Sequence, residues 1–254
     1  MRDAARIFCA VLLLAASPAL AEDPPEPGAG GPFSIEDVKT QDVGSLELEH
    51  VLGYERSHRG RDLFEFNPSI EYGLADRLEL RLGLSYGVGD ASSANRGRVT
   101  PGLRWQAVEQ AGLLPNIGFI ASVDLPFGAG DEGLATELLA IVSRTTGRGP
   151  GSWGVHLNAA WIARPDPGED ERRQGYRFGA AVSHVATDNL SVLVGYVQEK
   201  QDRGERDLRL VEAGFERRLG EVTLGMAFGA GLNEDSPRFR ITAGIKMDFQ
   251  IRPR

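Results

Sequence analysis

Cysteine and long apolar runs are both nearly absent from this 254-residue chain. Its one cysteine, Cys9, lies in an N-terminal segment that we expect to be removed on export, which leaves no disulfide or thiolate metal site. Beyond that segment, no apolar run is long enough to span a bilayer as a helix. The net charge of −8 argues against a nucleic-acid partner, and the sequence has no motif for a metal or another cofactor.

The first 21 residues have the layout of a cleaved signal peptide. Arg2 and Arg6 give a positive start, residues 7–16 form a short apolar core, and Ala19-Leu20-Ala21 provides a cleavage site. Residues 22–44 follow and are rich in proline, glycine and acidic side chains. We expect them to form a flexible leader on the periplasmic side.

From residue 45 onward, polar and apolar residues alternate. Every second residue from Phe64 to Tyr72 is apolar, and the same alternation continues from Leu78 to Tyr86 after a short turn. Side chains two apart share one face of a strand, so each strand has one apolar and one charged face. Such long alternation is typical of a barrel whose outside contacts lipid and whose inside contacts water.

Recurring turn signals divide residues 45–254 into about twelve strands. An even number of strands predicts an all-β, transmembrane antiparallel barrel with both termini in the periplasm. Connections alternate between short and longer polar ones, except that VEQAGLLP and TGRGPGS are long for periplasmic turns. Residues 136–145 are apolar on both faces, and residues 207–217 change phase near Leu210, which suggests a bulge. The expected strands are 45–56, 63–73, 77–87, 98–107, 116–127, 136–145, 153–164, 175–185, 190–199, 207–217, 222–232 and 238–250.

The ends and the inner face of these strands carry distinct residue types. Aromatic side chains gather near strand ends, as expected for girdles at the two lipid–water boundaries. Inward glycines would let strands bend toward closure. The charged inner row either lines a pore that screens solutes or fills a narrow barrel with salt bridges. The candidate pore-lining residues are Glu47, Glu49, Glu65, Glu71, Arg77, Glu79, Arg81, Arg98, Arg104, Asp124, His156, Arg177, Arg238 and Arg240.

The last strand carries a second pattern, which consists of Thr242, Gly244, Met247 and Phe249. It resembles the signal by which the barrel-assembly machinery recognises outer-membrane barrels, although Phe249 is not the final residue. The segments PFSIEDVKTQDVGSLELE, IEYGLADRLELRLGLSYG and ASVDLPFG resemble outer-membrane barrels of the "MetA-pathway of phenol degradation" family. The resemblance covers roughly residues 32–249 and implies a passive route for small solutes, aromatic or hydrophobic ones among them. It supplies no catalytic motif.

The histidines suggest an alternative to a channel, namely a barrel with catalytic activity on lipids. Lipid-modifying barrels use a Ser or a carboxylate beside a His, and His156 is predicted to face the lumen with Asn158 on the same face. The acidic loop 166–171 lacks the spacing of a calcium site. We therefore expect no catalytic, cofactor or metal residues.

The sequence thus predicts an outer-membrane barrel of a Gram-negative bacterium that acts as a narrow passive channel. Its expected partners are outer-membrane lipid, the barrel-assembly machinery and a small-molecule solute. The alternatives are a non-conducting structural or surface-interaction barrel and, third, a lipid-acting hydrolase.

Overall fold

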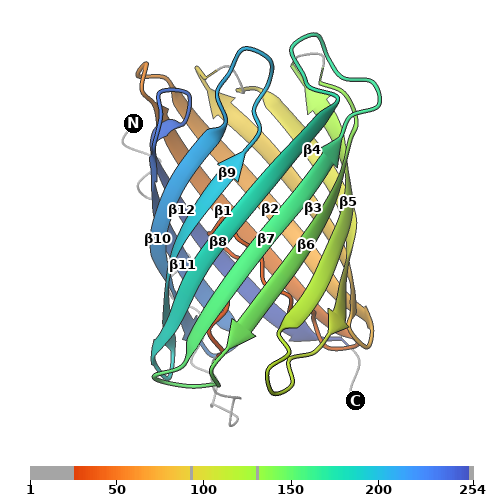
Figure 1. Ribbon diagram of the computed structural model, residues 1–254, viewed down its shortest axis with the longest axis vertical. Coiled ribbons are helices and arrows are strands. Elements are labelled where there is room, and N and C mark those ends of the chain that lie inside the picture. The colour runs from red at the N-terminus through yellow and green to blue at the C-terminus, as the bar shows by residue number, and fades with distance from the viewer. Residues whose placement is uncertain (1–25, 92–93, 130–131, 252–254) are drawn as a thin grey trace.

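The computed structural model describes residues 26–91, 94–129 and 132–251, so the predicted signal peptide lies outside the described residues. Within these ranges, no helix is long and apolar enough to cross a bilayer. Twelve strands account for most of the described chain (Figure 1). They are β1 (Ser45–Ser57), β2 (Asp62–Ala75), β3 (Leu78–Gly89), β4 (Arg96–Val108), β5 (Asn116–Gly128), β6 (Ala135–Thr145), β7 (Trp153–Ala163), β8 (Gln174–Thr187), β9 (Leu190–Glu199), β10 (Leu208–Leu219), β11 (Val222–Gly231) and β12 (Pro237–Gln250).

The strands form one closed barrel. Each strand pairs with its neighbours in sequence, and β12 pairs with β1 to complete the ring, from Ser45 opposite Gln250 to Ser57 opposite Pro237. Every pairing is antiparallel. Because β12 pairs with β1, the wall has no free edge. The predicted twelve-stranded antiparallel barrel is confirmed.

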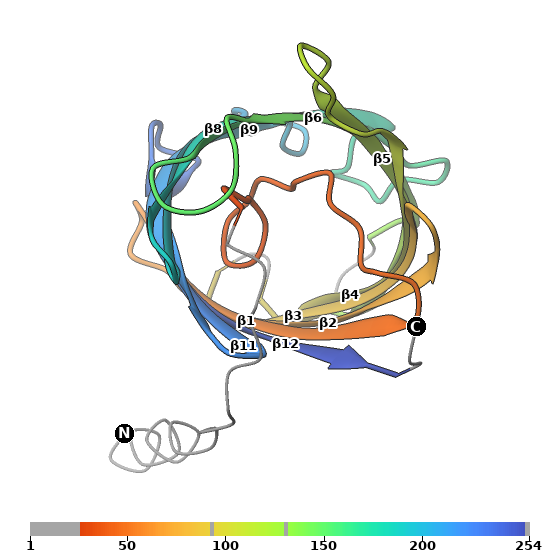
Figure 2. The same ribbon diagram turned by 90° about the horizontal axis from the view of Figure 1, so that it is seen from below.

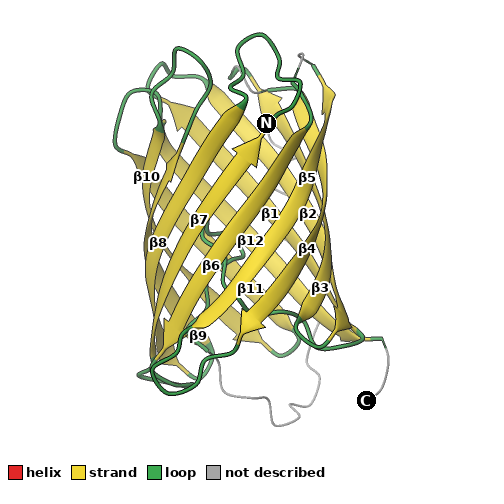
Figure 3. Cartoon of the chain, turned by 45° about the vertical axis from the view of Figure 1, so that its right-hand side comes forward, coloured by secondary structure: helices red, strands yellow, loops and turns green. Residues whose placement is uncertain are grey.

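The two ends of the barrel differ in their connections. We call the end where β1 begins and β12 ends the terminal end, and the opposite end the loop end. The terminal end has two-residue turns at 76–77, 188–189 and 220–221, together with the two longer connections 109–115 and 146–152. The loop end has the longer excursions, such as 164–173 and 200–207 (Figure 3). We expect the terminal end to face the periplasm.

The wall is inverted relative to a water-soluble protein. On β3, the apolar side chains Leu80 and Leu82 are each 47% exposed, while the neighbouring Glu79 is fully buried. Glu71 on β2 is 4% exposed beside the outward-facing Ile70 at 44%. A continuous apolar outer face with a charged interior is the pattern that lipid imposes on a spanning barrel.

The aromatic residues lie in two groups on this outer face. Tyr72, Trp105 and Trp153 lie near the terminal end, and Trp105 and Trp153 are more than half exposed. The second group lies toward the loop end and comprises Tyr54, Tyr86, Trp161, Tyr176 and Tyr196. The two groups occupy the positions of interfacial girdles.

Two strands place apolar side chains on the inner face of the wall. In β6, Leu139 and Ile141 face inward and are buried together with Val38 from the N-terminal segment. In β10, the register runs without a shift and the inward Leu210 is fully buried, so the predicted phase change is wrong. The buried inner row of β6 therefore indicates that an apolar segment packs against it inside the barrel.

That internal material is the N-terminal segment itself. Residues 26–44 pass through the lumen before the chain enters β1 (Figure 2). Ile35 is fully buried and Val38 is 2% exposed. The expectation that these residues are flexible is therefore wrong, because their apolar side chains and backbone groups find partners on the inner wall.

Candidate functional site: the lumen and its internal segment

The segment of residues 26–44, called here the lumen segment, enters and leaves the barrel at the same end. Glu26 forms an ion pair with Arg148 of the 146–152 connection at the terminal end. At its other end, the Gly44 N–H donates to the Gly73 carbonyl at 2.9 Å, close to the β2–β3 turn. The lumen segment is therefore a loop inserted from the terminal end, and no part of it threads through the loop end.

The apolar side chains of the lumen segment fit over glycines in the wall. A Cβ atom on Gly179 would lie 3.1 Å from Ile35 Cγ1, and one on Gly195 would lie 2.8 Å from Ile35 Cδ1. A Cβ on Gly118 would lie 2.8 Å from Val38 Cγ1. These glycines face inward, as predicted, and they provide the space into which the lumen segment packs.

Wall side chains also satisfy the backbone of the lumen segment. Glu212 accepts from the Ser34 N–H at 2.8 Å and from its hydroxyl at 3.0 Å. Asn158 accepts from the Glu36 N–H at 2.8 Å and donates to the Glu36 carbonyl at 2.9 Å. Buried backbone groups need such partners, and here the inner wall provides what a sheet ladder would otherwise supply.

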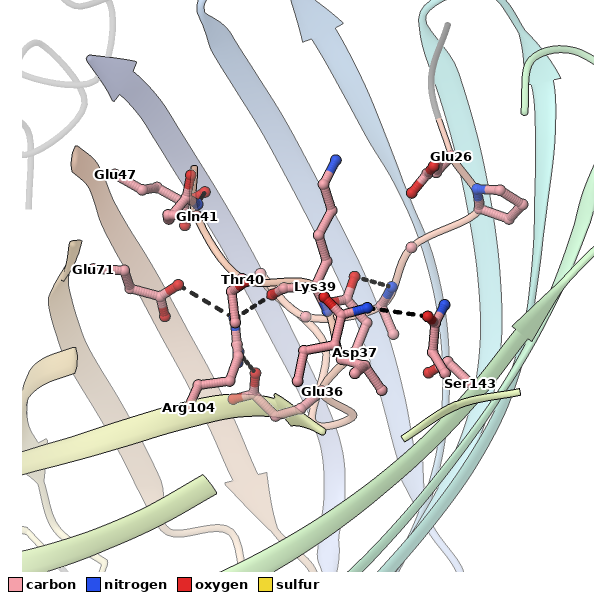
Figure 4. Close-up of a pocket in the computed structure, with 18 of the residues that line it drawn as sticks. Glu26, Glu36, Asp37, Lys39, Thr40, Gln41, Glu47, Glu71, Arg104 and Ser143 are labelled. Atoms are coloured by element: carbon pink, nitrogen blue, oxygen red, sulfur yellow. Dashed lines mark hydrogen bonds and ion pairs between the residues drawn. The ribbon is translucent and has the colours of Figure 1, made fainter. Parts of the chain in front are cut away.

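The strongest attachment is a compact charge cluster of Glu36, Glu71, Glu79, Arg81 and Arg104, part of which is shown in Figure 4. Arg104 lies 2.5 Å from a Glu36 oxygen, 3.4 Å from Glu71 and 3.3 Å from Glu79. It also donates to the Lys39 carbonyl at 3.0 Å. Arg81 contacts Glu71 at 2.6 Å and Glu36 at 3.4 Å. Two guanidinium groups thus bind the lumen segment to three neighbouring strands.

Glu36 is the member of this cluster that the lumen segment contributes. Burial raises the pKa of Glu36, but the nearby guanidinium groups of Arg81, Arg104 and Arg177 outweigh it and hold the pKa at about 2. The carboxylate is therefore charged at any physiological pH. Its attachment to the wall does not depend on moderate acidification.

A cavity of about 940 Å³, called here the vestibule, opens beside the lumen segment. The lumen segment and the terminal half of the wall form its lining, which is mainly polar. Seven of the predicted pore-lining residues border it, namely Glu47, Glu49, Glu71, Arg77, Arg81, Arg104 and His156. Residues from the loop half of the lumen, such as Glu65 and Arg240, do not line this cavity. The vestibule therefore ends at the lumen segment.

The other candidates lie in the loop half, at the rims or, in the case of Glu79, beneath the lumen segment. Arg240 pairs with Glu55, Arg177 with Glu137 at 2.6 Å, and Arg98 with Asp124 at 3.6 Å. Arg77 has a left-handed φ of 60° in the β2–β3 turn and pairs with the exposed Glu109, while Arg238 is exposed near the loop end. Glu79 is enclosed beneath the lumen segment, where it accepts from the Gln41 N–H at 2.8 Å.

His156 is buried between two serines. Its Nδ1 lies 3.1 Å from the Ser143 hydroxyl and its Nε2 lies 2.9 Å from the Ser183 hydroxyl. Both ring nitrogens are therefore engaged by hydroxyl groups, whereas in a Ser-His-acid site a carboxylate orients the ring. Within the described ranges, no group of three or more metal-ligating side chains is arranged to hold an ion. The acidic loop uses Glu171 to accept the N–H groups of Gly133 and Gly168, each at 2.7 Å.

The four residues of the predicted assembly pattern lie on β12, the strand that closes the barrel. Thr242 faces inward and donates to the Pro32 carbonyl at 2.7 Å, and Gly244 lies opposite Val51 on β1. Phe249 is 42% exposed on the outer face. Their role in recognition by the assembly machinery stays a prediction.

Sequence reasoning missed the residues of the lumen segment that contact the wall. Ser34, Ile35, Glu36 and Val38 lie in a segment whose composition suggests flexibility. The only available signal was indirect, namely the apolar inner face of residues 136–145. That face requires an apolar partner inside the barrel.

Comparison with known proteins gives the fold. No family model and no curated protein matches the sequence. An outer-membrane channel from Pseudomonas putida F1 is 15% identical with a TM-score of 0.60, and the match covers 84% of this chain and 98% of that one. The NanC porin is 9% identical with a TM-score of 0.55, covering 79% and 98% respectively. The fold is that of an outer-membrane β-barrel.

The β domain of the Bordetella autotransporter BrkA also shares this fold, at 15% identity and a TM-score of 0.51 over 82% of this chain and 100% of that one. A channel, a porin and an autotransporter domain thus have the same architecture. Function must therefore be argued from the lumen of this chain, and the family resemblance of its sequence stays a prediction.

Proposed function

We propose that this protein is a narrow passive channel of the outer membrane, closed or constricted by its own lumen segment. The observation that carries the proposal is a water-accessible vestibule that reaches the lumen segment and ends there. Hydrogen bonds, ion pairs and packing hold the segment in place, and both its ends lie at the terminal end. The segment can therefore withdraw from the lumen without passing through the barrel.

The lining of the vestibule favours a small polar solute. Among the described residues that border it, none is phenylalanine, tyrosine or tryptophan, and charged and amide side chains predominate. An aromatic or hydrophobic solute, which the family resemblance implies, would find few apolar contacts in this part of the path. Passage of a water-soluble molecule needs only a gap past the lumen segment.

Conductance in planar bilayers tests this function. We expect Ile35→Asp to raise the conductance well above that of the wild type, because the new carboxylate would be buried without a partner among Gly179, Gly195 and their neighbours. Val43→Asp is the matched control, since Val43 is 54% exposed where the segment leaves the lumen. A barrel that folds but passes no ions as wild type or as Ile35→Asp would be a non-conducting barrel, and the proposal would be wrong.

A further inference from the structure

The charge of the vestibule is unbalanced. Acidic side chains on its lining outnumber basic ones by eleven to seven. Arg81 and Arg104 are occupied by the cluster that holds the lumen segment. Part of this excess lies on β1 and β12, next to the β2 strand of that cluster, where Glu47, Glu49 and Asp248 border the vestibule.

Carboxylates on these strands face one another directly. Glu47 on β1 is in register with Asp248 on β12 and with Glu71 on β2. Like charges in directly opposite positions destabilise a sheet unless something neutralises them. Arg81 and Arg104 neutralise Glu71, but in the described part of the chain no basic group lies within ion-pair distance of Glu47 or Asp248. The Gln41 amide donates a hydrogen bond to Glu47 at 2.9 Å.

Glu49 supplies an independent observation on the same wall. Its Oε1 atom is buried and has no hydrogen-bond partner among the described residues. Lys246 is in register with Glu49, but its ammonium group pairs with Glu216 at 3.4 Å. A buried carboxylate oxygen without a partner is costly, and a cation in the neighbouring cavity lowers that cost by electrostatic attraction without touching the enclosed atom. Glu49 borders the vestibule, so its charge acts on an ion in the cavity.

We propose that the vestibule selects small monovalent cations over anions, and that Glu47, Glu49 and Asp248 set this preference. The inference rests on the proposed channel function and names its solute class. The described carboxylates do not converge into a group that could chelate a metal ion. They therefore attract a cation and release it, as charged walls do in channels.

The test is the zero-current potential in a KCl gradient across a planar bilayer. The wild type and the segment-releasing Ile35→Asp variant are each compared with a triple variant that adds Glu47→Gln, Glu49→Gln and Asp248→Asn. We expect a cation-over-anion permeability ratio of roughly ten before neutralisation, falling toward one afterward. Glu234→Gln is the control, because Glu234 is exposed in the β11–β12 loop and does not border the vestibule. This control should leave the ratio unchanged.

Three outcomes would count against the inference, in different ways. Currents that favour anions, or that show no preference, would overturn the selectivity while leaving the channel function intact. A cation preference that survives the triple substitution would show that these carboxylates do not set it. Absence of current in every variant would overturn the channel function and the selectivity together.

Discussion

Two groups of carboxylates in the same lumen are neutralised to different degrees. Around Arg81 and Arg104, the three carboxylates of the segment-holding cluster meet two guanidinium groups at ion-pair distances. Around Lys246, four carboxylates from β1, β10 and β12 have one ammonium group, and it pairs with only one of them. The carboxylates of the first group are paired with cations of the protein, while the second group has more carboxylates than cations and borders the water-filled vestibule.

This difference assigns separate roles to the two groups: the first holds the lumen segment in place, and the second attracts cations into the vestibule. A carboxylate whose partners are all protein groups contributes to structure, and removal of one partner leaves a buried charge. A carboxylate on the wall of a water-filled cavity without a protein cation acts on what enters the cavity. The predictions below change one group at a time, beginning with the largest expected effect.

The largest effect is expected from Arg104→Ala in the first group. The substitution leaves Glu36, Glu71 and Glu79 with Arg81 alone, and breaking a buried ion-pair network costs about 3–5 kcal/mol. We expect the lumen segment to leave the lumen, which would be measured as faster proteolysis within residues 26–44 and a higher conductance. Arg77→Ala is the control, because its pair with Glu109 is exposed and contributes little. Equal protease resistance in both variants would contradict the role given to Arg104.

A charge on the outer face should destabilise the barrel itself, not the lumen segment. Leu82 lies in the middle part of β3 and is 47% exposed, so Leu82→Arg would place a guanidinium group against lipid. We expect a loss of about 2–4 kcal/mol in the free energy of unfolding from phospholipid vesicles. Leu82→Ala separates the effect of charge from that of lost apolar area. Equal stability of the two variants would show that this face does not contact lipid.

The packing of Ile35 against Gly195 predicts a smaller loss of stability for the lumen segment, which a second substitution should compensate. Gly195→Ala should weaken the hold on the lumen segment by about 1–3 kcal/mol, because the new methyl group collides with Ile35 Cδ1. Ile35→Val removes that atom, so the double variant should recover much of the loss in a double-mutant cycle. Gly83→Ala is the control, since its nearest neighbour would be 3.8 Å away. Simple additivity of Gly195→Ala and Ile35→Val would contradict the packing.

Lys246→Met should produce the smallest change. It should raise the cation-over-anion permeability ratio, whereas neutralising the carboxylates should lower it. Loss of the one ammonium group among Glu47, Glu49, Glu216 and Asp248 should increase the cation-over-anion permeability ratio, by about two-fold once salt screening is considered. Arg206→Gln, an exposed loop-end substitution, should have no effect. A fall in the ratio for Lys246→Met would contradict this account of the charge on the wall.

The wall could be predicted from the sequence because lipid imposes a local rule. Alternation from Phe64 to Tyr86 is visible residue by residue, and it requires no knowledge of distant contacts. The same rule identified the inward Glu and Arg rows. It failed at the margins, where Arg77 belongs to a turn and Leu210 faces inward against the alternation of polarity.

The lumen segment could not be predicted in the same way. Its contacts join Glu36 to Asn158, 122 residues away, and Ser34 to Glu212, 178 residues away. A polar segment rich in proline and glycine has no period that indicates burial, and its partners are the same charged residues that would line an open pore. Whether Glu79 and Arg104 face water or hold a segment depends on a contact that no local pattern encodes.

The most direct test of the central claim is a cross-link between the lumen segment and the wall. If cleavage after Ala21 removes Cys9, an Ile35→Cys, Gly179→Cys variant has only the two introduced thiols, placed where Ile35 Cγ1 lies 3.1 Å from the position of a Gly179 Cβ. We predict that a disulfide forms under oxidising conditions and keeps the conductance at its low level, and that a reductant raises it. Failure of the two thiols to cross-link in a folded barrel, or the same conductance with and without reductant, would contradict the claim that residues 26–44 close the lumen.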